Sequence, residues 1–185
     1  MRKECIYYGC NNGKISQKEF LKEHNKIDKI TFPFSIVSIS TKAFYELKSL
    51  RQVFIPSSIT FIGEEAFRKC ELLTKISIPA SLTTIESGIC IACSSLTELI
   101  LPPNVTIIKS FGCKSLKEIK IPSSVTIIEC YAFSNCSSLL QIDIPSSVSK
   151  IEENVFDSCS SLTQISIPSL ITCINDRFFY NCSSL

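Results

Sequence analysis

The sequence predicts a solenoid of about seven stacked repeats, built mostly from short parallel β-strands. One observation is that prolines recur along the chain at a constant interval, except that the interval from Pro102 to Pro122 is three residues shorter. A second is that apolar residues recur at fixed offsets from each proline. A third is that 45% of the 185 residues are hydrophobic and only 19% are charged, a composition typical of a folded chain. The period is set by Pro33, Pro56, Pro79, Pro102, Pro122, Pro145 and Pro168.

Each repeat follows the pattern P-S-S-V-T-x-I-x-x-x-A-F-x-x-C-x-S-L-T-x-I-x-I, and the copy from Pro122 matches it nearly throughout. One repeat cannot bury its apolar side chains alone, whereas stacking places like residues in continuous ladders. The Phe slot holds Phe44, Phe67, Phe133, Phe156 and Phe179, with Cys90 as the exception. The Leu slot holds Leu50, Leu73, Leu96, Leu116, Leu139, Leu162 and Leu185.

The L-x-x-I-x-I segment of each repeat predicts a short strand, because its last residues alternate and are β-branched. Strands of successive repeats should pair in parallel, about 4.8 Å apart, and the following proline should end each strand. We expect the A-F-x-x-C segment on the opposite side to form a single helical turn or an irregular stretch. The repeat from Pro102 is three residues short near Lys109–Phe111, where we expect a local dent and no domain break.

The two ends differ from the array. Residues 1–26 are interpreted as an N-terminal cap or partial repeat, and Ser16–Glu19 has the spacing of a helix capping box. Residues 27–185 form the array, whose last repeat stops at Leu185 before its strand. This favours a fragment of a longer array, although a frayed or partner-covered last repeat is the alternative.

The eleven cysteines raise the question of metal or disulfide chemistry. Six of them share one slot, which favours a structural ladder of buried thiols that help to satisfy backbone carbonyls. Cys90-Ile-Ala-Cys93 is a CxxC motif without a second copy, so a redox or zinc role is disfavoured. Cys5 and Cys10 are either a disulfide or, as we favour, two thiols. The ladder is Cys70, Cys93, Cys113, Cys136, Cys159 and Cys182.

Other chemistry-bearing patterns are weak. His24 is the only histidine and occupies a Cys-equivalent slot, so a structural or surface role is favoured over a nucleophilic arrangement. Paired carboxylates for acid–base catalysis are not evident. The sequence therefore predicts no enzyme activity, no cofactor and no metal.

The alternation within each predicted strand directs some side chains out of the sheet. Phe54 and Ile100 are large apolar residues in this outward position, two repeats and thus about 10 Å apart. They are either scattered surface hydrophobes or a binding hot spot flanked by Lys75 and Glu98. The predicted protein-binding face comprises Phe54, Lys75, Ser77, Glu98, Ile100, Glu118, Lys120, Gln141 and Asp143.

The repeat resembles the BspA-like, or Treponema-type, leucine-rich repeats over roughly residues 27–185. The resemblance rests on seven proline-anchored copies with A-F-x-x-C-like and L-x-x-I-x-I-P elements; IPSSVTIIECYAFSNCSSL also looks like copies found in some parasitic protists. It implies a leucine-rich-repeat solenoid that forms a right-handed curved arc with a concave parallel sheet. It further implies binding to a protein, with host and extracellular-matrix proteins as candidate partners, often at a cell surface, and no catalytic residues.

Together these observations predict a non-catalytic protein-binding module for adhesion or scaffolding. The alternative is a structural or sensor region of a longer protein that carries a separate catalytic domain. The balanced charge of +2 does not suggest nucleic-acid binding, and no apolar run is long enough for a membrane span. The lack of a visible signal peptide or anchor favours the cytoplasm, whereas the resemblance favours the cell surface.

Overall fold

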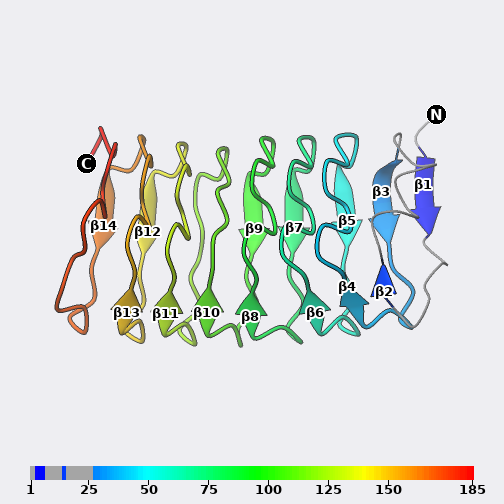
Figure 1. Cartoon of the computed structure of the whole chain (residues 1–185), viewed down its shortest axis with the longest axis horizontal. Coiled ribbons are helices and arrows are strands. Elements are labelled where there is room, and N and C mark those ends of the chain that lie inside the picture. Colours follow the sequence, from blue (N-terminus) through cyan, green and yellow to red (C-terminus); the bar gives the residue numbers. More distant parts are fainter. Residues whose placement is uncertain (1–2, 7–13, 16–26) are drawn as a thin grey trace.

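The computed structural model describes residues 3–6, 14–15 and 27–185, and it places the repeats side by side along the long axis of the molecule (Figure 1). Most repeats contribute one strand to each of two columns of parallel strands. The long-strand column consists of β1 (Lys3–Ile6), β3 (Ile27–Thr31), β5 (Gln52–Phe54), β7 (Lys75–Ser77), β9 (Glu98–Ile100), β12 (Gln141–Asp143) and β14 (Gln164–Ser166). The short-strand column consists of β2 (Lys14–Ile15), β4 (Ser38–Ile39), β6 (Phe61–Ile62), β8 (Thr84–Ile85), β10 (Ile107–Ile108), β11 (Ile127–Ile128) and β13 (Lys150–Ile151).

The strand register confirms that like residues of successive repeats lie on top of one another. In the long-strand column, Lys75 pairs with Glu98 and Ile76 with Leu99, so each residue meets its equivalent in the next repeat. Across the shortened repeat, Ile108 of β10 pairs with Ile128 of β11, so the pairing follows the shorter interval there. The predicted parallel solenoid is therefore confirmed, while the short-strand column, formed by the V-T-x-I segments, was not predicted.

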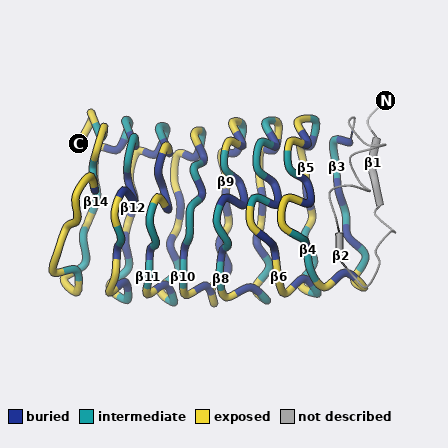
Figure 2. The backbone as a smooth tube through the Cα atoms, viewed as in Figure 1, coloured by how far each residue is buried: buried dark blue, intermediate teal, exposed yellow. Residues whose placement is uncertain are grey.

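The buried apolar side chains form one core cluster, and buried residues recur in successive repeats along the array (Figure 2). The Leu-slot side chains from Leu50 to Leu162 are fully buried. Phenylalanine rings stack between adjacent repeats, with centroids 5.2 Å apart for Phe44–Phe67 and 5.7 Å apart for Phe133–Phe156. In the final repeat, the equivalent Leu185 side chain is exposed.

The outer segment is not a helical turn, and that part of the prediction is wrong. The described residues contain no helix, and most of the outer segments hold two residues with positive φ, such as Lys42 and Glu46 (φ 58° and 61°). A right-handed helix requires negative φ in successive residues, so two left-handed residues prevent one. The backbone bonds to the next repeat instead: the Phe44 N–H donates to the Ala66 carbonyl at 2.8 Å.

The shortened repeat disturbs both sides of the array locally. On the outer side, Phe111 takes the Phe slot, since its ring lies 6.0 Å from that of Phe133, and only Gly112 keeps a positive φ. On the other side, residues 117–121 form no strand, so the long-strand column is interrupted between β9 and β12. The short-strand column continues through this repeat from β8 to β13.

At the N-terminal end, β1 pairs with β3 and β2 pairs with β4, so both columns extend beyond the predicted array. Ser16–Glu19, His24 and Cys10 lie outside the described residues, as does the side chain of Cys5. Within the described part of the chain, no helix is long and apolar enough to cross a membrane.

Candidate binding face

The outward side chains of the long-strand column form the surface predicted for binding, which we call the long-strand face. In β5, β7, β9 and β12 the middle residue is buried and both neighbours are exposed. The side chains of Phe54 and Ile100 are 56% and 41% exposed. Glu118 and Lys120 are exposed as well, although their segment is not a strand. Every residue of the predicted face is thus exposed to solvent, and its role in binding stays a prediction.

An apolar hollow of about 680 Å³ opens at the β5 end of this face. Phe34 and Phe54 line it together with Lys75 and Ser77. The Lys29 ammonium lies 5.4 Å from the centroid of the Phe54 ring, a cation–π distance. Phe34, which is 79% exposed, was missed by the sequence analysis. The sequence feature that could have indicated Phe34 is its position: it directly follows Pro33, where most repeats have serine.

A second hollow of about 610 Å³ lies where the long-strand column is interrupted, and we call it the polar hollow after the charged side chains that line it. It brings together five predicted residues, namely Glu98, Glu118, Lys120, Gln141 and Asp143. Between the two hollows, the Lys75 ammonium lies 2.5 Å from the Glu98 carboxylate. Ile100 lines neither hollow, so the structure does not group it with Phe54 in one cavity. The face therefore has an apolar, basic end and a polar, largely acidic centre.

The cysteine ladder is part of the core. The thiols of Cys70, Cys93 and Cys159 donate to carbonyls of the preceding repeat at 3.3, 3.1 and 3.1 Å. Burial raises the pKa of the Cys136 thiol to about 12. In the CxxC motif, the hydrogen bond with Cys93 and then burial raise the pKa of Cys90 well above its usual value. Redox cysteines require a lowered pKa, so these protonated thiols fit the structural role.

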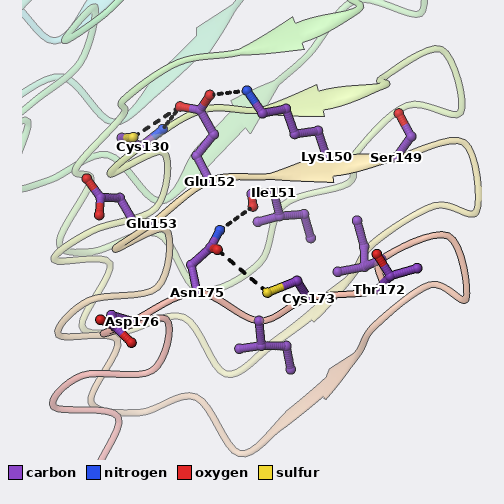
Figure 3. Close-up of a pocket in the computed structure, with 12 residues that line it drawn as sticks. Cys130, Ser149, Lys150, Ile151, Glu152, Glu153, Thr172, Cys173, Asn175 and Asp176 are labelled. Carbon is purple, nitrogen blue, oxygen red and sulfur yellow. Dashed lines mark hydrogen bonds and ion pairs between the residues drawn. The ribbon is translucent and has the colours of Figure 1, made fainter.

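A third hollow, of about 730 Å³, lies on the short-strand column beside β13 (Figure 3). The Glu152 carboxylate accepts hydrogen bonds from the Lys150 ammonium at 2.7 Å and the Cys130 thiol at 3.0 Å. The bond from Lys150, followed by that from Cys130, lowers the pKa of Glu152 to about 2. The same carboxylate raises the pKa of the Cys130 thiol, first through their hydrogen bond.

This arrangement does not favour catalysis or metal binding. A carboxylate beside a thiol opposes formation of the thiolate, which is the nucleophilic form. The Cys173 thiol lies on the other side of the hollow, 3.9 Å from the Asn175 side-chain oxygen (Figure 3). In the described ranges, no group of three or more His, Cys, Asp or Glu side chains is placed to hold a metal ion.

The fold and the long-strand face define a solenoid of leucine-rich repeats. A family model described as a BspA-type leucine-rich repeat region matches residues 13–111 and 110–185, with six copies. The chain therefore belongs to the BspA-type leucine-rich repeat family. Its relatives are typically non-enzymatic repeat proteins that serve as protein-interaction modules, often associated with the cell surface.

Solved structures of bacterial leucine-rich repeat proteins are similar to this chain. The T. pallidum protein TpLRR is 28% identical with a TM-score of 0.59, over 85% of this chain and 67% of its own. A protein from Eubacterium ventriosum is 27% identical with a TM-score of 0.68, over 81% and 40%. One from Bacteroides ovatus is 26% identical with a TM-score of 0.60, over 93% and 57%. No curated protein gives a significant match.

Proposed function

We propose that this chain is a non-catalytic adhesion or scaffold module that binds a protein partner through the long-strand face. The observation that carries the proposal is the pair of exposed aromatic side chains, Phe34 and Phe54, around one hollow. Exposed aromatics in a pocket are typical of the few residues that supply most of the energy in a protein interface. Strand β5 holds Phe54 and the turn after Pro33 holds Phe34, and a preordered position lowers the entropy cost of binding.

The charges on the face indicate how a partner would be oriented. Lys29 and Lys75 flank the apolar hollow, while Glu118 and Asp143 lie in the polar hollow farther along the array. A complementary partner carries an apolar side chain and acidic groups that face the β5 end. Its basic groups face the interruption of the long-strand column. Complementary charges fix the register of a complex and speed its formation. The family resemblance makes a host or extracellular-matrix protein the partner class to test first.

The test begins by treating intact cells with a protease and asking whether this chain is cleaved. The result decides whether partners are sought outside or inside the cell. Proteins captured by the immobilised chain are then purified, and their affinities are measured for Phe54→Ala, Phe34→Ala and Ile100→Ser. We expect Phe54→Ala to weaken binding about tenfold or more, as for a hot-spot aromatic. Phe61→Ala, which truncates an exposed ring on β6 away from the face, is the matched control. Unchanged affinity for all three face variants contradicts the proposal.

A further inference from the structure

A recess on the outer side of the array lies apart from the long-strand face and has a different chemical character. Its volume is about 750 Å³, and it extends over outer segments of five repeats, from Ile91 to Asn181. Ligand pockets commonly have volumes of about 300–1,000 Å³. From this recess we infer that the chain has a second site, which binds a neutral oligosaccharide and is independent of the proposed protein-binding face.

The three-residue deletion explains where the recess lies. Residues 109–112 replace the seven residues found at 129–135 in the next repeat, so one left-handed turn is missing from the outer side. Gly112 occupies the shortened turn, and a Cβ atom built there would lie 3.2 Å from the Ile91 side chain and 3.5 Å from the Ser134 carbonyl. The longer outer segments of the neighbouring repeats, with Ala92 and Tyr131, line the two sides.

Most residues that line the recess are polar and uncharged, while much of its exposed surface is apolar. Serines, two asparagines and Tyr131 supply most of its side chains, Lys114 is the only charged one, and no described carboxylate lines it. The hollow in Figure 3, by contrast, contains Glu152 and Asp176, and the polar hollow of the long-strand face contains Glu118. A neutral ligand rich in hydroxyl groups therefore suits the recess better than an anionic or cationic one.

The hydrogen bonds among the lining side chains determine which hydrogen-bonding groups a ligand must provide. Ser137 and Ser160 donate their hydroxyl hydrogens to backbone carbonyls of the preceding repeat, at 3.5 and 3.4 Å. Each hydroxyl oxygen then keeps lone pairs that can accept from a ligand. The Asn135 amide donates to the Ser134 hydroxyl at 2.8 Å, and Ser134 is only 6% exposed. This buried partner holds the amide in place without requiring a charged group.

Tyr131 supplies the apolar surface that a sugar ring also needs. Its side chain is 48% exposed and lines the recess. Its backbone N–H donates to the Glu153 carbonyl at 3.3 Å, which ties this left-handed residue to the next repeat. An aromatic ring offers a rigid apolar face at low entropy cost, against which the C–H face of a pyranose packs, while its hydroxyl remains available to a polar group. The ring, the serines and the amide together match a chain of neutral sugars.

The inference is tested by titrating the full chain with neutral trisaccharides and tetrasaccharides of glucose and of N-acetylglucosamine, followed by NMR and calorimetry. We expect at least one probe to bind with a dissociation constant in the range of about 1 mM or below, and Tyr131→Ala to weaken it about tenfold. Tyr180→Ala removes another exposed tyrosine that does not line the recess, and it should leave the affinity unchanged. Circular dichroism verifies that both variants are folded.

A second variant tests the role of the deletion itself. Replacing residues 109–112 with the seven-residue sequence of residues 129–135 should refill the recess and abolish sugar binding. Because this graft restores the regular repeat length, the chain should stay folded, with an unchanged unfolding midpoint or a higher one. The inference is overturned if no probe binds the wild-type chain, if Tyr180→Ala weakens binding as much as Tyr131→Ala, or if the folded graft still binds.

Discussion

Truncating Phe133 to alanine tests whether the ladder of stacked rings stabilises the array. The Phe133 side chain is fully buried, and its ring lies 6.0 Å from Phe111 and 5.7 Å from Phe156. Removing a buried phenylalanine costs about 3–5 kcal/mol in free energy of unfolding, including the cavity that is left. Each aromatic pair contributes about 0.5–1.5 kcal/mol beyond burial. With a ring on both sides, Phe133→Ala should fall in the upper half of that range.

Phe111→Ala provides an internal comparison, because the slot on its other side holds Cys90 and no ring. Phe111→Ala removes one aromatic pair, whereas Phe133→Ala removes two. Phe111→Ala should therefore lower the free energy of unfolding by about 0.5–1.5 kcal/mol less than Phe133→Ala. Urea unfolding followed by circular dichroism measures both, and an unchanged slope verifies that the transitions are comparable. The surface truncation Phe61→Ala should change stability by less than about 0.5 kcal/mol. If Phe133→Ala matches this control, the ring ladder does not stabilise the fold.

Two further outcomes are expected from unfolding experiments. The folded-state pKa of Glu152, about 2, lies below its ordinary value of 4.5, so its ionised form stabilises the chain above pH 4.5 and this contribution is lost as the pH falls toward 2. The stability difference between wild type and Glu152→Gln, measured by urea unfolding across this pH range, should therefore shrink on acidification; a constant difference would refute the assigned interaction. For Gly63, a Cβ atom would lie 2.3 Å from the Thr41 backbone nitrogen, so Gly63→Ala should cost about 1–3 kcal/mol. Thermal unfolding checks this, with Ser40→Ala in the equivalent slot of the preceding repeat as control; equal midpoints for both variants would contradict the close approach.

Residues such as Leu73 and Phe133 were assignable from the sequence because their position depends only on the repeat period. A side chain that recurs once in every repeat has the same surroundings in each copy, so stacking fixes its burial. The outward orientation of Phe54 followed from strand alternation in the same way. Phe34 was not found, since it lies just after the proline, outside the alternating segment. The grouping of Glu98, Glu118 and Asp143 also required the structure, because it depends on the interruption of the long-strand column.

The outer side shows the same division between local pattern and tertiary contact. Lys42 and Glu46 are not glycines, yet both adopt positive φ, because their backbone N–H groups donate to carbonyls of the next repeat instead of along a helix. The two-residue strands of the short-strand column are likewise too short to give a periodic signal, and they form only because equivalent segments of other repeats lie beside them.

The sequence by itself determined the repeat length, the identity of the core ladders, the parallel stacking and the outward residues, since each follows from periodicity within one chain. Only the tertiary structure decided the left-handed outer turns, the interruption at residues 117–121, and which exposed side chains share a hollow. The physical reason is that these features depend on contacts between repeats: the outer turns form hydrogen bonds to the next repeat, and the interruption falls in a repeat that is three residues shorter than both of its neighbours.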